Sequence, residues 1–325
     1  MYFVHAELQK LSLPNNFMSI PHHPLHCLVA APHAPFHEDG SVNLAIIEKQ
    51  AEHLLRSGVR CAFVNGSTGE SSSLSVQERI DIAHRWSEVV RGTKLQLVVH
   101  VGANALEDAR ILARHGESIG ASALSALAPS YYKPRSLGLL VDCCASIAEA
   151  APQTPFYFYD IPSLTGVQFS SLAFLEQASL RIPTLVGIKF TNPDLSQYQM
   201  VLNAHEGRWD LPWGIDQAFL AALALGARGA IGSGYNFAAP VYKKLWEAFN
   251  RGDWSTAREA QLFGVRLVEL LESFGYLAAA KATMGFLGVD VGPARLPNSN
   301  LSAEQKVALR NALESVNFFE RVHTS

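Results

Sequence analysis

A single charged residue, Lys189, lies in the apolar segment Leu185-Val186-Gly187-Ile188-Lys189-Phe190. An amine buried in a strand loses hydration, which favours its neutral form and lowers its pKa. A neutral amine in a dry pocket can attack a ketone carbonyl. The alternative is a lysine whose stem packs in the core while its ammonium reaches solvent. We interpret Lys189 as a candidate nucleophile.

A tyrosine is the second candidate for chemistry, in the run Phe156-Tyr157-Phe158-Tyr159. A phenol near a reacting carbonyl carbon can relay protons while a bond breaks. Aromatic residues in strands mostly serve packing, which is the alternative interpretation for either tyrosine. Because side chains alternate along a strand, Tyr157 and Tyr159 point the same way, and spacing does not choose between them.

Polar turns supply further candidates. Ser67 and Thr68 lie in Gly66-Ser67-Thr68-Gly69, where hydroxyl and backbone N–H groups could bind a carboxylate. The same residue types are ordinary in turns. Asp216 and Gln217 follow an apolar run and could receive the hydroxyl groups of a sugar-like tail, or form a solvated loop.

Two histidine pairs are candidates for metal ligands by their spacing. His22 and His26 are four residues apart, as are His33 and His37, a spacing that suits a metal only on a helix. A proline interrupts each pair, so neither should be helical. We therefore expect no metal site.

Elements that could bring these residues together alternate regularly along the chain. Eight short apolar strands are expected, each followed by room for a helix, at residues 27–31, 60–64, 95–101, 123–127, 156–159, 185–189, 211–213 and 230–231. This pattern predicts parallel strands joined by helices, and the even spacing favours a (β/α)8 TIM barrel over two doubly wound domains. Reacting groups of such barrels lie at the carboxyl ends of the strands, where the candidates are found.

Helical periodicity predicts helices at residues 44–57, 240–249, 254–274 and 302–316. A capping box at Ser75 and Glu78 predicts the start of a further helix. We expect three regions. Residues 1–25 form a weakly ordered N-terminal lead-in, 26–238 the TIM barrel, and 239–325 the last barrel helix and a C-terminal helical extension.

Composition excludes several classes of function. The 325 residues are 48% hydrophobic and 17% charged, with a formal net charge of -3 and no basic run. Nucleic acid and anionic membrane are therefore poor partners. No apolar run reaches the roughly 18 residues that a membrane span needs. Four cysteines without CxxC spacing indicate reduced thiols and a cytoplasmic protein.

Taken together, these segments resemble the dihydrodipicolinate synthase and N-acetylneuraminate lyase superfamily from about Cys27 to Pro297. The motifs that carry the resemblance are Phe63-Val64-Asn65-Gly66-Ser67-Thr68-Gly69-Glu70, Tyr159-Asp160-Ile161-Pro162-Ser163-Leu164-Thr165-Gly166-Val167 and Gly187-Ile188-Lys189-Phe190-Thr191. The second motif favours Tyr159 over Tyr157. Leu164 stands where the synthases usually have an arginine, so the resemblance is to the lyase branch.

The resemblance implies a class I aldolase without metal or organic cofactor. Lys189 would form an imine with the C2 ketone of a 2-oxo sugar acid, and Tyr159 would accept the C4 hydroxyl proton. Ser67 and Thr68 would hold the carboxylate. The residues implied at the sugar end are Thr191, Gly214, Asp216, Gln217 and Ser233.

The resemblance further implies a homotetramer in which a tyrosine enters a neighbouring site, with Tyr131 and Tyr132 as candidates. The implied activity is cleavage of N-acetylneuraminate to N-acetylmannosamine and pyruvate. The lyases carry a glutamate where this chain has Gln217, and usually a threonine where it has Gly234. Cleavage of another 2-oxo sugar acid is therefore the alternative. A non-catalytic sugar-acid-binding protein is a third possibility.

Overall fold

Seven parallel strands form one sheet in the order β6-β5-β4-β3-β2-β1-β7 in this computed structural model, which describes residues 20–323. The strands are β1 (Leu28–Ala30), β2 (Cys61–Val64), β3 (Gln96–His100), β4 (Ala123–Leu127), β5 (Phe156–Asp160), β6 (Leu185–Phe190) and β7 (Ala230–Gly232). They coincide with seven of the eight runs expected from the sequence. The predicted TIM barrel is confirmed.

The eighth position of the barrel is filled by the segment 210–214, between β6 and β7. Trp213 makes isolated parallel bridges to Phe190 on one side and to Ala230 on the other. The strand expected at 211–213 is therefore present as single bridges and not as a continuous ladder. Pro212 contributes to this difference, because it has no N–H to donate.

Gly187 allows this closure. A Cβ atom at Gly187 would lie 1.7 Å from the carbonyl oxygen of Asp210. Only a residue without a side chain lets segment 210–214 approach β6 this closely. The glycine two residues before Lys189 is thus required by the barrel itself.

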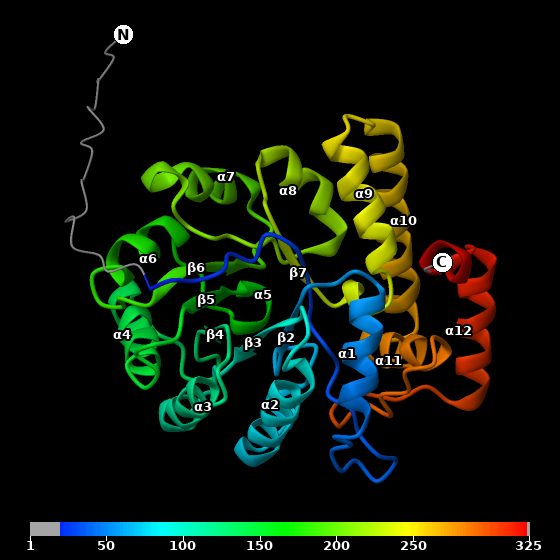
Figure 1. The fold of residues 1–325 in the computed structure, drawn as a ribbon, viewed down its shortest axis with the longest axis horizontal. Coiled ribbons are helices and arrows are strands. Elements are labelled where there is room, and N and C mark those ends of the chain that lie inside the picture. Colours follow the sequence, from blue (N-terminus) through cyan, green and yellow to red (C-terminus); the bar gives the residue numbers. More distant parts are fainter. Residues whose placement is uncertain (1–19, 324–325) are drawn as a thin grey trace.

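Helices surround the sheet (Figure 1). They are α1 (Ile46–Arg56), α2 (Val76–Val90), α3 (Leu106–Ser118), α4 (Leu137–Ala148), α5 (Pro162–Thr165), α6 (Ser171–Ala178), α7 (Leu195–Asn203), α8 (Phe219–Leu225), α9 (Ala239–Asn250), α10 (Trp254–Ser273), α11 (Tyr276–Phe286), α12 (Ala303–Ser315) and α13 (Phe318–Val322). The predicted capping box is present: Ser75 Oγ accepts from Glu78 N at 3.2 Å, and Ser75 N donates to the Glu78 carboxylate at 2.8 Å.

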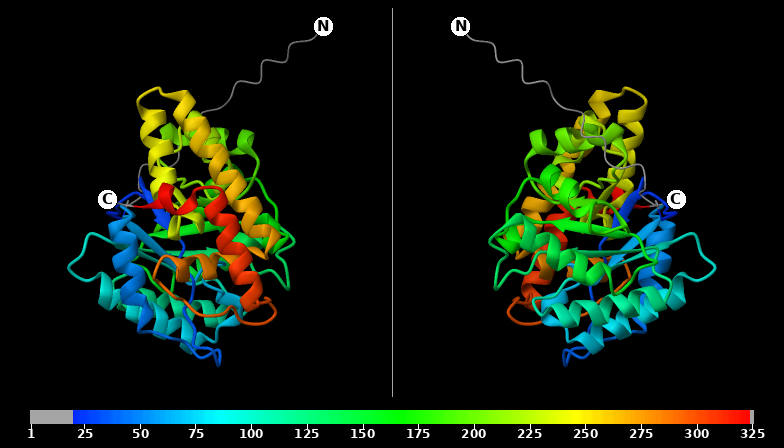
Figure 2. Two further views of the ribbon diagram at one scale, coloured as in Figure 1. Left: turned by 90° about the vertical axis from the view of Figure 1, so that its right-hand side faces the viewer. Right: turned by 90° about the vertical axis from the view of Figure 1, so that its left-hand side faces the viewer.

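Two of the C-terminal helices were not predicted, α11 and α13. The sequence of α11 is YLAAAKATMGF, which is apolar on nearly every side and so shows no amphipathic stripe. Helices α9 to α13 gather on one side of the barrel, the right side of Figure 1 and the near side in the left view of Figure 2. No helix within residues 20–323 is both long and apolar enough to cross a membrane.

The core has two layers. A large cluster fills the space between the sheet and the helices and includes Cys144 of α4. A smaller cluster lies inside the barrel and includes Leu25, Cys61 and both Tyr157 and Tyr159. Leu25 is buried although the expected lead-in of residues 1–25 contains it; most of that lead-in, residues 1–19, lies outside the described residues.

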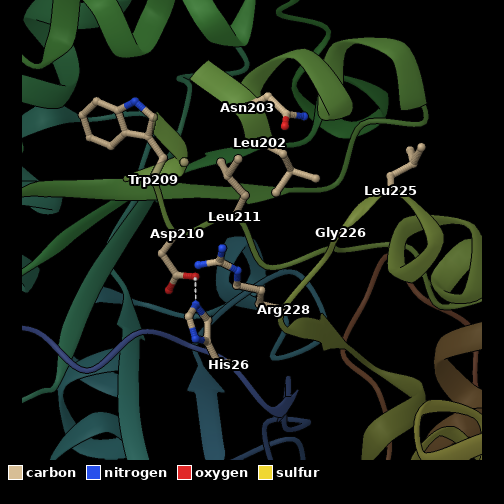
Figure 3. Close-up of a pocket in the computed structure, with 10 residues that line it drawn as sticks. His26, Leu202, Asn203, Trp209, Asp210, Leu211, Leu225, Gly226 and Arg228 are labelled. Atoms are coloured by element: carbon tan, nitrogen blue, oxygen red, sulfur yellow. Dashed lines mark ion pairs between the residues drawn. The ribbon is translucent and has the colours of Figure 1, made fainter. Parts of the chain in front are cut away.

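The floor of the barrel, at the amino ends of the strands, is closed by Asp210. Its carboxylate accepts hydrogen bonds from the Leu25 backbone N–H at 2.7 Å and from the Tyr157 hydroxyl at 2.5 Å. His26 lies 3.6 Å from the same carboxylate, with Arg228 beside the pair (Figure 3). Tyr157 is therefore committed to the floor, and Tyr159 is left at the opposite end.

Candidate active site

Lys189 and Tyr159 are directly opposite each other in the pairing of β6 with β5. Both side chains are 4% exposed. The Lys189 amine lies 3.9 Å from the centroid of the Tyr159 ring and 3.9 Å from that of Phe63. Burial lowers the pKa of Lys189 to about 7, and the negative charge of Asp216 opposes this fall. A large fraction of the amine is therefore neutral at neutral pH.

The surroundings of Tyr159 keep it a phenol. Burial raises its pKa, and the neighbouring hydroxyl groups of Ser67 and Thr191 oppose the rise. The ring packs edge to face against His100, with centroids 5.8 Å apart. Burial holds the pKa of His100 well below its usual range, with Arg79 and Lys189 contributing, so this imidazole is neutral.

The turn 66–69 presents unused hydrogen-bond donors. In the described part of the chain, the backbone N–H groups of Ser67 and Thr68 donate to no protein acceptor, and both residues are half-buried. Two neighbouring free N–H groups beside hydroxyls form a small anion site. This geometry suits the carboxylate expected from the sequence.

The shape of this turn is fixed by left-handed backbone on both flanks. Asn65 has φ 58° and Glu70 has φ 53°, a conformation that costs free energy in residues other than glycine. On one flank, Asn65 Nδ2 donates to Arg79 O at 2.8 Å, and Asn65 O accepts from His100 Nδ1 at 2.9 Å. These contacts tie the turn to α2 and β3.

On the other flank, Glu70 ties the turn to the C-terminal region. Its carboxylate accepts from Lys281 Nζ of α11 at 2.8 Å and from the backbone N–H of Arg295 at 2.8 Å. Both side chains of the ion pair are buried. The sequence signal for Lys281 is the same as for Lys189, one cation in an apolar run, but Lys281 has a carboxylate partner.

A cavity of about 380 Å³ opens at the carboxyl ends of the strands. All five residues implied for the sugar end line it, namely Thr191, Gly214, Asp216, Gln217 and Ser233. A Cβ atom at Gly214 would lie 1.9 Å from Thr191 Oγ1, so this glycine gives the threonine hydroxyl its space. The expected set is therefore brought together in one cavity.

Asp216 is the buried carboxyl of this cavity. Its Oδ2 accepts from the Gly234 backbone N–H at 2.8 Å. Burial raises its pKa to about 6, which this N–H and the charge of Lys189 oppose. A Cβ atom at Gly232 would lie 1.8 Å from Oδ1, and one at Gly234 would lie 2.7 Å from Oδ2. The two glycines make room for the carboxyl group.

Residues of the C-terminal helices, which no sequence motif indicates, also line this cavity. Tyr276 of α11 places its hydroxyl 2.6 Å from Ser233 Oγ, and Glu272 comes from the end of α10. A second cavity, of about 350 Å³, includes Ser67 and His100 in its lining. Leu164 borders both cavities, so the two lie side by side above the barrel.

The aromatic pair Tyr131 and Tyr132 projects from the loop after β4. The side chains are 79% and 86% exposed, and their rings pack edge to face with centroids 5.0 Å apart. Asn104 Oδ1 accepts from the Tyr131 backbone N–H at 3.1 Å, which holds the loop. Neither tyrosine is among the lining residues of the two cavities described above.

The histidines raised in the sequence analysis do not assemble a metal site. Among the described residues, no three His, Cys, Asp or Glu side chains gather as metal ligands would. His33 is buried, and burial lowers its pKa to about 3. Its ring is thus a neutral part of the core.

The fold and the site define a class: a (β/α)8 barrel with a buried lysine at the carboxyl end of its sixth strand. The chain belongs to the dihydrodipicolinate synthetase family, whose model matches residues 24–316.

Individual relatives agree with this assignment. The N-acetylneuraminate lyase of Pongo abelii is 36% identical over 305 residues, which cover 93% of this chain and 95% of that protein. The structure of Proteus mirabilis N-acetylneuraminate lyase is 39% identical with a TM-score of 0.88, covering 91% of this chain and 100% of that one. A Ruminococcus gnavus sialic acid aldolase, described as a catalytic lysine mutant, is 27% identical with a TM-score of 0.84, covering 90% and 96%.

Proposed function

We propose that the chain is a Schiff-base-forming lyase that reversibly cleaves N-acetylneuraminate to N-acetylmannosamine and pyruvate. The observation that carries the proposal is the Lys189 amine, buried beside Tyr159, with its pKa lowered to about 7. The names of the relatives support the substrate, since the lyases of Pongo abelii and Proteus mirabilis are named for N-acetylneuraminate.

In the first step, the substrate carboxylate binds the free N–H groups and hydroxyls of Ser67 and Thr68. This places the C2 ketone of the open-chain sugar acid at Lys189. The neutral amine attacks C2, and loss of one water gives the imine, which is protonated. Desolvation favours attack, because no hydration shell has to be removed from the amine.

In the second step, the C3–C4 bond breaks and its electrons move into the protonated imine, giving an enamine. Tyr159 relays the proton of the C4 hydroxyl: it accepts this proton while donating its own to the neighbouring Ser67 hydroxyl, which in turn passes its proton to the substrate carboxylate bound there. C4 leaves as the aldehyde of N-acetylmannosamine. Protonation of the enamine at C3 and addition of water then release pyruvate and regenerate Lys189. The iminium serves as the electron sink, so the route uses no cofactor.

The test is borohydride reduction in the presence of pyruvate, followed by mass spectrometry of the intact chain and of its peptides. We expect a permanent pyruvate adduct on Lys189 and none in Lys189→Ala. Tyr159→Phe should still be trapped but should release pyruvate from N-acetylneuraminate roughly 10²-fold to 10⁴-fold more slowly. An adduct on another lysine would refute the role of Lys189. Absence of any adduct would refute the imine and favour a non-catalytic sugar-acid-binding protein.

The substrate is tested separately. The protein could be trapped by pyruvate and yet release no pyruvate from millimolar N-acetylneuraminate. This result would support the aldolase chemistry and indicate that the substrate is another 2-oxo sugar acid. We further propose that the enzyme acts in the cytoplasm as a homotetramer. Four free cysteines are consistent with a reducing compartment, and the exposed pair Tyr131 and Tyr132 is consistent with subunit contact.

A further inference from the structure

Glu272 occupies a defined place in the cavity at the sugar end of the site. It lies near the end of α10 and shares the cavity lining with Asp216 and Gln217. The helix is fixed against that segment by Gln261, whose Nε2 donates to Asp216 O at 3.1 Å. Gln261 Oε1 also accepts from Leu220 N at 2.7 Å. The position of Glu272 relative to the cavity is therefore held by the fold.

Stability does not explain a carboxylate at this place. Glu272 lies in the last turn of a 20-residue helix, where the negative end of the helix dipole disfavours an acidic side chain. Within residues 20–323, its carboxylate accepts no hydrogen bond and no basic side chain pairs with it. By contrast, Glu314 of α12 pairs with Arg310 at 3.0 Å. An unpaired carboxylate at a helix end and on a cavity wall points to a ligand.

The chemistry of the neighbouring groups indicates which ligand. Tyr276 follows Glu272 by four residues and contacts Ser233 through its hydroxyl at 2.6 Å. Gln217 adds a neutral amide, while the Asp216 carboxyl is buried and already accepts from Gly234. Glu272 is thus the exposed carboxylate of a rim whose other polar side chains, apart from the buried Asp216, carry hydroxyl or amide groups. Such a rim accepts hydrogen bonds from several hydroxyls and repels an anionic tail.

We infer that Glu272 is a specificity-determining residue that binds hydroxyl groups at the polyhydroxylated end of the substrate, far from the imine. The inference rests on the proposed function and adds a residue from the C-terminal extension to it. It also predicts discrimination against 2-oxo acids whose tail carries a phosphate or a second carboxylate.

The experiment compares Glu272→Gln with Glu269→Gln. Both remove one negative charge from an exposed position of α10, but Glu269 does not line the cavity. For Glu272→Gln we expect kcat/KM on N-acetylneuraminate to fall about tenfold, mainly through KM, because a charged acceptor of hydroxyl groups is lost. Glu269→Gln should match the parent protein.

A short 4-hydroxy-2-oxo acid without a polyol tail separates tail binding from a structural effect. The parent and Glu272→Gln should cleave it equally, and pyruvate should be trapped on Lys189 equally in both. Equal loss on the long and the short substrate, or no loss on either, would overturn the inference. Failure of the parent protein to be trapped by pyruvate would instead refute the proposed function, so the two failures are distinguishable.

Discussion

At the scale of single residues, the chemistry depends on which buried groups have a partner. Lys189 and Lys281 are both lone cations in apolar runs, and both are buried. Lys281 pairs with Glu70 at 2.8 Å, whereas Lys189 faces two aromatic rings. This difference depends on which distant segments meet in the barrel, so spacing in the sequence does not reveal it.

The choice between Tyr157 and Tyr159 has the same origin. Their common direction was correctly predicted from strand geometry, and both lie inside the barrel. Asp210, more than fifty residues later in the chain, accepts a hydrogen bond from the Tyr157 hydroxyl and so holds this side chain at the floor of the barrel. The register of the assembled sheet separates the two tyrosines further, because it pairs Tyr159 with Lys189.

The lowered pKa of Lys189 predicts a pH dependence. Because its folded-state pKa of about 7 lies below the ordinary value, the amine is neutral above that pH and becomes protonated below it. We expect kcat/KM to fall on the acid side with a midpoint near pH 7, by about tenfold per pH unit below it. Initial rates of pyruvate release from pH 5.5 to 9 measure this.

A matched variant tests the cause of that midpoint. Asp216→Asn removes the carboxylate that raises the pKa of Lys189, so the acid limb should move to lower pH while the overall rate also falls. A profile that is flat between pH 5.5 and 8, or an acid limb that moves upward in Asp216→Asn, would contradict this assignment.

At the scale of elements, the C-terminal helices contribute more to the site than the sequence indicates. The helices predicted at 240–249, 254–274 and 302–316 lie close to α9, α10 and α12, and we expect from the sequence that one is the last barrel helix and the others form an extension. The prediction does not include a role for them in the site. It missed α11, whose all-round apolar sequence lacks the periodicity that marks a half-buried helix. That helix supplies Tyr276 to the cavity and Lys281 to the turn.

The Glu70–Lys281 pair should therefore affect both stability and carboxylate binding. In Lys281→Met the buried Glu70 carboxylate loses its partner, which we expect to lower the free energy of unfolding by about 3–5 kcal/mol. The double variant Glu70→Gln/Lys281→Met removes both charges and should lose clearly less. Urea unfolding at pH 7 measures the two differences.

The same variants report on the Ser67 and Thr68 turn. If the pair holds this turn, the pyruvate concentration for half-maximal trapping should rise in Lys281→Met while the trapped residue remains Lys189. Equal stability of the single and double variants, together with unchanged pyruvate dependence, would show that the pair has neither effect.

At the scale of the whole molecule, the even alternation of apolar runs and helical patterns was enough to predict the barrel. The exception is the segment 210–214, whose single bridges are set by Pro212 and by the close approach at Gly187. The barrel nevertheless closes, because Trp213 N donates to Gly229 O at 2.9 Å and Ile231 N donates to Trp213 O at 2.8 Å. Prediction of a strand from the sequence requires a run of several apolar residues, whereas closing the barrel at this segment requires only these few hydrogen bonds.

The exposed pair Tyr131 and Tyr132 leads to a prediction about assembly. If one of them completes the site of a neighbouring subunit, its alanine variant should have low activity as a pure protein. Co-refolding that variant with Lys189→Ala should restore activity, because hybrid oligomers then contain sites with an intact lysine and an intact neighbouring tyrosine. Pyruvate release by the mixture measures this.

The control for the mixture is each inactive variant refolded alone, with oligomer size measured by sedimentation. If the tyrosine instead serves its own subunit, no site in the mixture is complete and activity stays at the level of the separate variants. A monomeric parent protein would exclude the shared site altogether.

The two buried thiols, Cys61 and Cys144, make the opening of each layer separately measurable. Cys61 lies inside the barrel and Cys144 lies between α4 and the sheet, and burial raises the pKa of both. Alkylation requires an exposed thiolate, so each is modified only when its own surroundings part. The rate at Cys144 reports detachment of one helix, and the rate at Cys61 reports separation of the strands. The ratio of these two alkylation rates therefore tells whether the helix layer separates before the strands do, or whether both layers open together.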